Sequence, residues 1–365
     1  MHNFVQKTSM LFLLVLVLVS LGCTSSTPSD QTTNSLPADT QTTLGQSNDS
    51  DTTVDGTAGT SPDTDVVVVE YEFSLSSSEP ISSLSDSELS SAAEGFSRII
   101  PKKVKLVNSF SFSDIETILS NSEDLQSFGF NTVLIRIPYT VTSEGLFELI
   151  QKGNLSESDT EKLFETYVVL AKQKHWAVWI APSFSVSESL IALPDFQVKA
   201  KELSFKWAAV AQKYFADFFS PAIVIESAFQ KLTDSERRTL DETTSFYESI
   251  AFSLPTYYTG PCIVYLANSS QSGYFNKGTC KWVAFDLTKT SSQLTASIER
   301  FEAIADNWQV KFIPVQIVDG KELYSDLFTA LQGQEFAGGL GLTNLSWLND
   351  KEFRDSFKEF LIEFK

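Results

Sequence analysis

Two acidic residues stand at or near the ends of short apolar runs, where buried strands are expected to end. Glu226 directly follows the run at 222–225, and Asp286 lies within the run at 282–287. Two carboxyl groups can share acid–base catalysis, because burial raises the pKa of one, which keeps a proton to donate, while the other stays ionised. The alternative is structural: Glu226 forms an ion pair with Arg136 or accepts a hydrogen bond from a loop amide.

Other polar side chains and aromatic rings stand where further apolar runs end. Rings stack on the flat faces of sugars, and amide or guanidinium groups bind sugar hydroxyls, so this mixture is typical of a carbohydrate site. We assign catalysis to Glu226 and Asp286, with Asp319 as the alternative partner of Glu226. The residues expected to contact a substrate are Arg136, Tyr139, Gln230, Asn268, Gln316 and Trp347. Similar positions are held by Asn108, Ser109, Ser183, Phe184, Tyr265, Asp319 and Asn344.

Histidine is scarce, and this excludes several kinds of site. His2 lies near the start of the chain, and His175 precedes an expected strand, at the end of the fold opposite the residues above. Ser-His-Asp catalysis therefore lacks its histidine, and a histidine-based zinc site lacks enough ligands. We expect no metal and no cofactor.

Eight apolar runs, interleaved with helical patterns, have to position these residues. Their order and length predict an α/β fold, a (β/α)8 TIM barrel, whose chemistry lies at the carboxyl ends of the strands. Glu226 and Asp286 would then stand two strands apart, at roughly 10 Å, near the upper end of the ~6.5–9.5 Å range for inverting glycosidases. The expected strands are Val104–Ser109, Thr132–Pro138, Trp176–Pro182, Ala222–Glu226, Cys262–Ala267, Trp282–Leu287, Lys311–Gln316 and Gly338–Leu342.

Helix signals separate the strands. Capping-box patterns stand at 113–116, 158–161 and 233–236. Apolar residues recur every three to four positions from Leu203 to Phe218, from Ile298 to Trp308 and from Phe353 to Phe364. Each stripe predicts a helix with one face packed on a sheet.

One segment resembles a known family. GFNTVLIRIPYTV, residues 129–141, is similar to the second-strand segment of clan A glycoside hydrolases, the cellulase and mannanase type, in which Gly-hydrophobic-Asn and an apolar run precede Arg-hydrophobic-Pro. Here two additional residues precede Arg136. VYLANSSQSGYFNKGTCKWVAFDLT, residues 264–288, resembles the family's fifth-to-sixth strand region, and the order of elements agrees from about residue 100 to 365.

The resemblance implies an acid/base glutamate after the fourth strand, a nucleophilic glutamate after the seventh, and a second-strand arginine that holds the nucleophile. Arg136 takes the place of this arginine. Glu226 or, in a shifted alignment, Gln230 takes the acid/base place, and Gln316 takes the nucleophile's place. Glutamine cannot attack an anomeric carbon or hold a proton for transfer, so a catalytically degenerate member is a second interpretation. Ser183 and Asp286 stand where the family usually has histidines.

The N-terminus predicts export. Lys7 precedes an apolar run at 11–21, which is shorter than the about 20 residues that span a membrane and suits a signal peptide. The run ends at Gly22-Cys23 and resembles a lipoprotein signal, in which Cys23 carries the lipid. We expect a signal peptide at 1–22 and a lipid-anchored protein on the outer face of the membrane. An uncleaved anchor is the alternative.

The remaining chain divides by composition. Residues 23–65 are rich in Ser, Thr and Asp and predict a disordered tether. Residues 66–100 are an extension with one strand at 67–74, and the barrel takes residues 101–365. The net charge of -19 argues against nucleic acid as a partner, because phosphate binding needs a basic face. We expect the lipid to be the membrane contact, and we expect a monomer.

Two cysteines remain besides Cys23. In an exported chain Cys262 and Cys280 are expected to pair, because they stand at the N-terminal ends of neighbouring strands. Two separate buried thiols are the alternative.

Three functions follow from these observations. The leading hypothesis is a surface-anchored, glycoside hydrolase-like barrel that cleaves or binds a polysaccharide or glycan. The first alternative is a non-catalytic barrel that binds sugar or a protein. The second is the solute-binding lipoprotein of an ABC transporter, which requires two lobes and a hinge.

Overall fold

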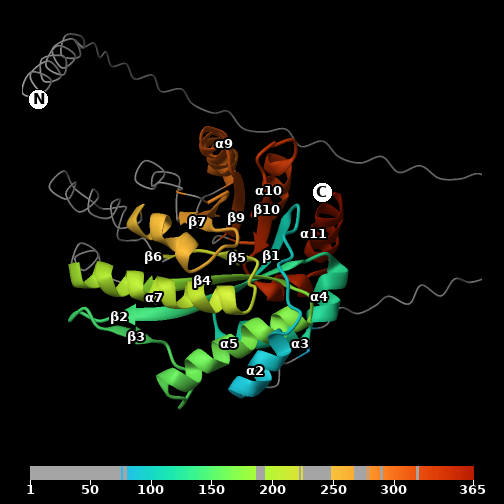
Figure 1. Cartoon of the computed structure of the whole chain (residues 1–365). Helices are drawn as coiled ribbons and strands as arrows, with labels where there is room; N and C mark the ends of the chain where they lie inside the picture. Colours follow the sequence, from blue (N-terminus) through green and yellow to red (C-terminus); the bar gives the residue numbers. More distant parts are fainter. Residues whose placement is uncertain are drawn as a thin grey trace, which may run out of the picture. The chain divides into compact units, whose positions relative to one another are not determined.

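The computed structural model describes residues 75–76, 80–185, 194–221, 223–224, 248–266, 278, 280–287, 291–317 and 320–365. Parallel strands form the centre of the fold, and the helices lie around them (Figure 1). The barrel strands are β1 Val104–Ser109, β2 Thr132–Val141, β4 Ala177–Ser185, β5 Phe218–Phe219, β6 Ile223–Val224, β7 Ile263–Leu266, β8 Trp282–Leu287, β9 Lys311–Ile317 and β10 Gly339–Leu342.

The strands close into a ring made of two sheets. One sheet has the order β10-β1-β2-β4-β5, with β6 continuing along β4 beyond β5, and the other has the order β7-β8-β9. Two parallel bridges join them: Phe219 pairs with Cys262, and Phe312 pairs with Ala337. Counting β5 and β6 as one strand, the ring confirms the predicted (β/α)8 barrel. The short strand β3 Phe147–Leu149 extends it, antiparallel to the end of β2.

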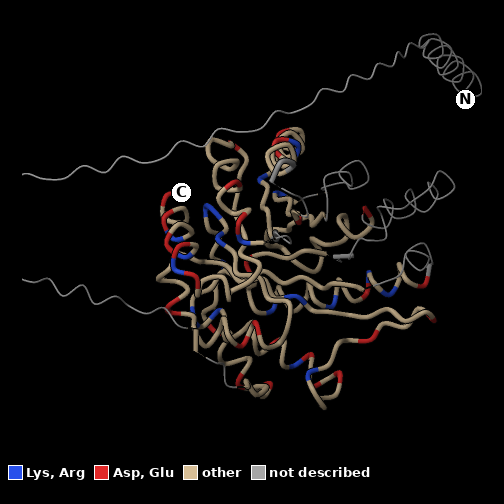
Figure 2. Tube along the Cα trace, turned by 180° about the vertical axis from the view of Figure 1, so that it is seen from behind, with Lys and Arg blue, Asp and Glu red and all other residues tan. Residues whose placement is uncertain are grey.

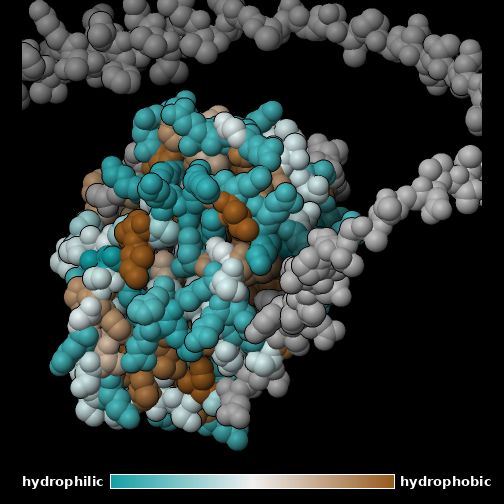
Figure 3. All heavy atoms as spheres, turned by 90° about the vertical axis from the view of Figure 1, so that its right-hand side faces the viewer, coloured by the Kyte–Doolittle hydropathy of each residue, from teal (hydrophilic) through white to brown (hydrophobic). Residues whose placement is uncertain are grey.

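Helices cover the outside of this ring. They are α3 Phe112–Ser120, α4 Ser122–Phe128, α5 Glu157–Gln173, α7 Pro194–Lys213, α9 Ser291–Trp308, α10 Leu323–Leu331 and α11 Lys351–Glu363, with 3-10 turns η3 Leu254–Thr256 and η5 Leu345–Asn349. Charged residues of both signs are interspersed along these helices (Figure 2), and one face of the molecule is largely hydrophilic with separate apolar patches (Figure 3).

Two helices begin earlier than the sequence patterns predict. Ser111 caps α3 by accepting a hydrogen bond from the Asp114 backbone, and Ser156 caps α5 in the same way through Asp159. The predicted caps at 113–116 and 158–161 are therefore wrong by two residues. Glu116, the expected N3 residue, is instead buried and accepts hydrogen bonds from the Tyr167 hydroxyl and the Ile81 amide. The pattern at 233–236 lies outside the described residues.

Side chains alternate between two cores. One cluster fills the inside of the ring and includes Leu106, Leu134, Trp179 and Ile313, all at 0% exposure. Phe218 belongs to it, although the apolar stripe predicted Phe218 on a helix. The helix ends at Lys213, and Phe215 takes the left-handed conformation with φ 54°, so the chain turns before Phe218 enters strand β5.

Residues 80–100 pack on the barrel and contain the helix α2 Asp86–Ala93, which the sequence analysis did not anticipate. The Ile99 amide donates to Asp217, a fully buried carboxylate. Asp217 also forms an ion pair with buried Lys172 at 2.9 Å and accepts from the Val178 amide at 2.7 Å. These contacts fasten the segment to the N-terminal end of the barrel. The strand expected at 67–74 lies outside the described residues.

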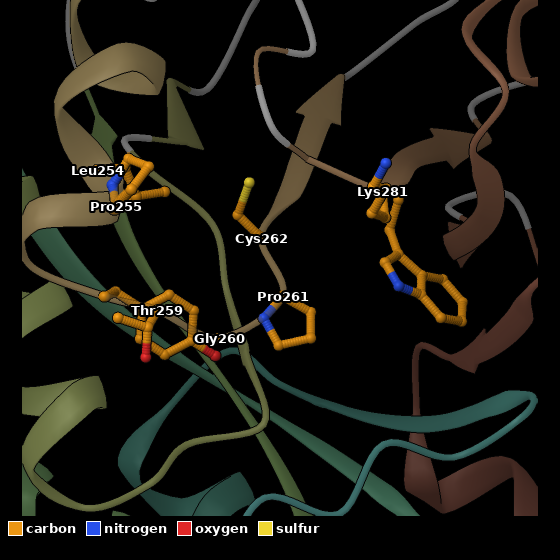
Figure 4. Close-up of a pocket in the computed structure, with 9 residues that line it drawn as sticks. Leu254, Pro255, Thr259, Gly260, Pro261, Cys262 and Lys281 are labelled. Atoms are coloured by element: carbon orange, nitrogen blue, oxygen red, sulfur yellow. The ribbon is translucent and has the colours of Figure 1, made fainter.

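Cys262 and Cys280 form the expected disulfide, with a Cα–Cα distance of 4.7 Å. Cys262 directly precedes β7, and Cys280 lies two residues before the start of β8, so both stand at the N-terminal ends of their strands. A cavity of about 320 Å³ opens beside Cys262, lined by residues that include Thr259, Pro261 and Lys281 (Figure 4). This cavity is on the side of the barrel opposite the carboxyl ends of the strands.

Candidate functional site

Four side chains from four strands form a hydrogen-bonded chain at the carboxyl end of the barrel. Arg136 on β2 donates through Nε to Oδ1 of Asn108 on β1, at 3.3 Å, and through Nη2 to the hydroxyl of Tyr265 on β7, at 2.8 Å. The Tyr265 hydroxyl donates in turn to Oδ1 of Asp286 on β8. We call Asn108, Arg136, Tyr265 and Asp286 the mouth cluster.

Strand alternation explains why these residues meet. Side chains two apart on a strand face the same way, and Leu106, Leu134, Ile263 and Ala284 all line the apolar interior of the ring. Each member of the mouth cluster stands two positions further along its strand than one of these four residues. The cluster therefore forms the next layer of the interior, above the apolar layers.

Aromatic rings hold the guanidinium of Arg136 in place. Its Cζ lies 4.8 Å from the ring centroid of Phe110 and 5.2 Å from that of Tyr265. Cations are attracted to the faces of such rings. Below them, Trp179 packs on Tyr265 with 6.1 Å between ring centroids. The arginine is thus half-buried and fixed by two hydrogen bonds and two rings.

The charges of the mouth cluster are separated by the tyrosine. Among the described residues no carboxylate lies within 4.0 Å of Arg136, so the cluster contains no direct ion pair. Burial raises the pKa of the Asp286 carboxyl, and the nearby Arg136 charge and the Tyr265 hydrogen bond only partly oppose this. Burial also raises the pKa of Tyr265. Asp286 therefore holds a proton at a higher pH than an ordinary aspartate does.

Asn108 has an amide nitrogen without a partner. The side chain is 3% exposed, and its Oδ1 accepts from Arg136, which fixes which end of the amide is the nitrogen. Nδ2 is buried and makes no hydrogen bond within the part of the chain that the structure describes. Asn108 and Tyr265 were expected at strand ends, but neither was predicted to contact a substrate.

Gln316 lies next to Asp286 through its backbone. The two residues are paired in the register of β8 and β9, directly after an irregularity between Phe285 and Asp286. The residue in the predicted nucleophile position is therefore beside the described carboxylate of the mouth.

Tyr139 lies elsewhere. It is 1% exposed, and its hydroxyl accepts a hydrogen bond from Nε1 of Trp207 at 2.9 Å. Its ring belongs to the core between the strands and the helices, because Tyr139 is an odd number of positions from Arg136 and faces the opposite side of β2. A ring buried on this face cannot contact a substrate at the mouth, so Tyr139 is not part of the site.

Trp347 lies in the turn η5 that follows β10. It is half-buried, and its ring contacts Tyr324 edge-on, with 5.8 Å between centroids. It also lies 6.1 Å from the ring of Phe353 on α11. These rings stabilise the C-terminal helix pair, and a substrate contact by the exposed part of Trp347 stays a prediction.

Several predicted site residues lie outside the described part of the chain. They are Cys23, Glu226, Gln230, Asn268 and Asp319. The pairing of Glu226 with Asp286, and the alternative ion pair of Glu226 with Arg136, therefore stay predictions.

A small apolar cavity of about 160 Å³ adjoins Arg136 at the rim. Its walls come from β1, β2, α3 and α5, and Phe110 and Ile150 at its edge are 43% and 45% exposed. Within the described ranges no group of three or more His, Cys, Asp or Glu residues is arranged to hold a metal ion. In the same ranges no helix has the length and apolar character needed to cross a membrane.

No protein-family model matches the chain, and no curated protein matches it in sequence. Solved structures do match. A GH113 β-1,4-mannanase aligns with a TM-score of 0.55 and 11% identity, over 72% of this chain and 99% of that one.

Two further solved structures agree. A GH113 β-mannanase from Alicyclobacillus acidocaldarius in complex with ManMIm aligns with a TM-score of 0.56 and 10% identity, over 73% of this chain and 99% of that one. A trimodular GH5_4 endoglucanase aligns with a TM-score of 0.50 and 10% identity, over 75% of this chain and 62% of that one. At these identities the likeness shows the fold alone, a TIM barrel like that of these three enzymes.

Proposed function

We propose that this chain acts on a glycan that it binds at the carboxyl end of its barrel. The mouth cluster carries the proposal: a fixed cation, an amide donor, a tyrosine hydroxyl and a carboxyl group of raised pKa converge where barrels of this kind bind their substrates. The fold is shared with mannanases and an endoglucanase, which supports a sugar polymer as the ligand.

Asp286 is the proposed general acid. Its protonated carboxyl would give a proton to the glycosidic oxygen, which leaves the anomeric carbon with the bonding electrons. Glu226 would take a proton from a water molecule, whose oxygen forms the new bond to that carbon with inversion. A retaining reaction is disfavoured, because Gln316 cannot act as the nucleophile next to Asp286.

Binding without cleavage is the second candidate, and the position of Gln316 favours it. A mouth that has lost its nucleophile still offers Arg136, Asn108 and Tyr265 for hydrogen bonds to a sugar. The solute-receptor alternative has no such support, because it requires two lobes and the described strands close into one ring.

We further propose that the protein is anchored by a lipid on Cys23 and faces the outside of the membrane. The signal-like segment and the disulfide, which persists in oxidising compartments, support this location. The parent should then incorporate a labelled fatty acid, and Cys23→Ser should not. A parent protein that takes up no fatty acid would exclude the lipid anchor.

Hydrolysis is tested on mannans, β-glucans and the producing cell's own surface glycans, with product anomers followed by NMR. We expect inverted products and a loss of about 100-fold or more in kcat for Asp286→Asn and for Glu226→Gln. Equal activity in both variants would remove these two residues from the mechanism. Binding of the same glycans without turnover, by calorimetry, would establish the second candidate instead.

A further inference from the structure

We propose that Asn108 and Arg136 form a subsite for a carboxylate, so that the glycan recognised at the mouth contains uronic acid units. This inference deepens the proposed function and rests on it. Two side chains of the mouth cluster, Asn108 and Arg136, have N–H groups that make no hydrogen bond among the described residues.

The first donor is the side-chain amide of Asn108. Nδ2 is buried and has no partner among the described residues, although a buried donor without an acceptor destabilises a folded protein. The Arg136 hydrogen bond to Oδ1 prevents the amide from turning over to relieve this. An oxygen supplied by a ligand would satisfy Nδ2.

The second donor is the guanidinium of Arg136. Nε and Nη2 donate to Asn108 and Tyr265, and Nη1 makes no hydrogen bond within the described ranges. The guanidinium is held by the rings of Phe110 and Tyr265, so it is oriented before any ligand binds. Pre-orientation lowers the entropic cost of binding.

The charge of Arg136 distinguishes a carboxylate from a neutral hydroxyl. Its nearest described counter-charge is Asp286, which it reaches only through the Tyr265 hydroxyl. The higher pKa of Asp286 weakens this compensation further. An anion is therefore the acceptor that gains most, because it adds Coulomb attraction to the hydrogen bond that a neutral hydroxyl could also accept.

The net charge of -19 limits the kind of acidic glycan. Nucleic acid needs a broad basic face, whereas one carboxylate needs one fixed cation. A densely charged polymer would be repelled by the acidic surface. Short oligomers and glycans with widely spaced uronic acids are the expected ligands.

The test compares oligosaccharides that differ only at C6. Mannohexaose and β-1,4-linked hexamannuronate form one pair, and cellohexaose with β-1,4-linked hexaglucuronate forms the second. Calorimetry on the full chain should show about tenfold tighter binding of the acidic member of at least one pair, a difference typical of one charge-assisted contact.

The variants locate the subsite. Asn108→Asp keeps the shape but neutralises the charge of Arg136, and Arg136→Gln removes that charge. Each variant should lose the preference for the acidic oligomer. Arg98→Gln is the matched control, because Arg98 also lies over two rings, those of Phe215 and Tyr258, but bonds to the Ala216 carbonyl at the other end of the barrel. It should keep the preference. Circular dichroism checks that each variant is folded.

The outcomes separate the two proposals. Equal or weaker binding of both acidic oligomers, with neutral ones bound, overturns the carboxylate subsite and leaves the glycan proposal in place. A preference that survives in either Asn108→Asp or Arg136→Gln also overturns the subsite. Binding of no glycan, including the cell-surface material, overturns both.

Discussion

Arg136 and Asp286 are joined through a single atom, the hydroxyl oxygen of Tyr265, which accepts from the arginine and donates to the aspartate. The arrangement keeps a cation and an acid in the same layer of the barrel without direct contact. A barrel interior normally tolerates charges only when they are paired or hydrogen-bonded. The tyrosine meets this condition and leaves part of each charged group available to a ligand.

The first prediction concerns the pH dependence of stability. The folded-state pKa of Asp286 lies above its unfolded value, so the folded protein binds this proton more readily, and stability falls as pH rises from about 4 through the folded pKa. Asp286→Asn lacks this cost. The variant should melt at a higher temperature than the parent at pH 7, and the difference should vanish toward pH 4. A lower melting temperature at pH 7 contradicts the prediction.

Tyr265→Phe, unlike Asp286→Asn, should destabilise the folded protein. It removes a hydroxyl that two half-buried groups share, and a loss of about 1–3 kcal/mol in the free energy of unfolding is expected from denaturant titration. Without its donor, the pKa of Asp286 should rise further, which would move the alkaline limb of any activity profile to higher pH. Tyr258→Phe, whose hydroxyl donates to the Ala216 carbonyl away from the mouth, should leave that profile unchanged.

Removal of the disulfide should destabilise the barrel. Cys262 and Cys280 are 18 positions apart, and closing a loop of this size contributes about 3 kcal/mol in the chain-entropy model. The double replacement by alanine, or reduction of the parent, should lower the melting temperature. The same melting temperature with and without a reductant would show that the closed loop stays ordered without the bond.

The ion pair of Lys172 and Asp217 gives a sharper test of packing. Lys172→Met leaves Asp217, at 0% exposure, without its counter-charge, which should cost about 3–5 kcal/mol in the free energy of unfolding. Adding Asp217→Asn should recover part of this loss, because it removes the uncompensated charge and the single amide oxygen can still accept from either Val178 or Ile99. A double variant less stable than Lys172→Met alone would refute the explanation by a buried charge.

Helix ends offer a prediction in the stabilising direction. Gln309 follows α9 with φ 52°, a left-handed conformation that favours glycine. Gln309→Gly should stabilise the protein by about 0.5–1 kcal/mol. Gly129 follows α4 with φ 120°, and Gly129→Ala should have the opposite effect. Thermal unfolding measures both, and effects of the same sign would contradict the argument.

The strands were largely predictable, because each begins with an apolar run and ends near a polar residue. Val104–Ser109 and Trp282–Leu287 agree with the structure at both ends. Phe218 was not predictable, because its spacing from Tyr214 continues the helical stripe by chance. The helix caps were displaced because Ser113 and Ser158 satisfy the same pattern as Ser111 and Ser156, two residues earlier.

The sequence predicted which strand ends carry the site residues, but not which of these residues contact one another. Sequence reasoning placed Arg136 and Asp286 at the carboxyl ends of their strands, and the structure brings them together. Tyr265 was expected among the aromatic residues at the strand ends, but no pattern in the sequence indicated that its hydroxyl bonds to both of them. Tyr139 failed for a related reason: in a strand the face on which a side chain lies depends on odd or even spacing, and Tyr139 is three residues from Arg136.

The two narrow junctions of the ring have a consequence for its internal motions. Within the described residues each junction is a single bridge pair, Phe219 with Cys262 and Phe312 with Ala337. Slow local openings, seen as exchange of amide hydrogens with deuterium, should begin at such places. The disulfide ties Cys262, the β7 member of the first junction, to Cys280 at the start of β8, so oxidation holds one side of that junction in place. Reduction should therefore speed amide exchange at the β5–β7 junction more than at the β9–β10 junction.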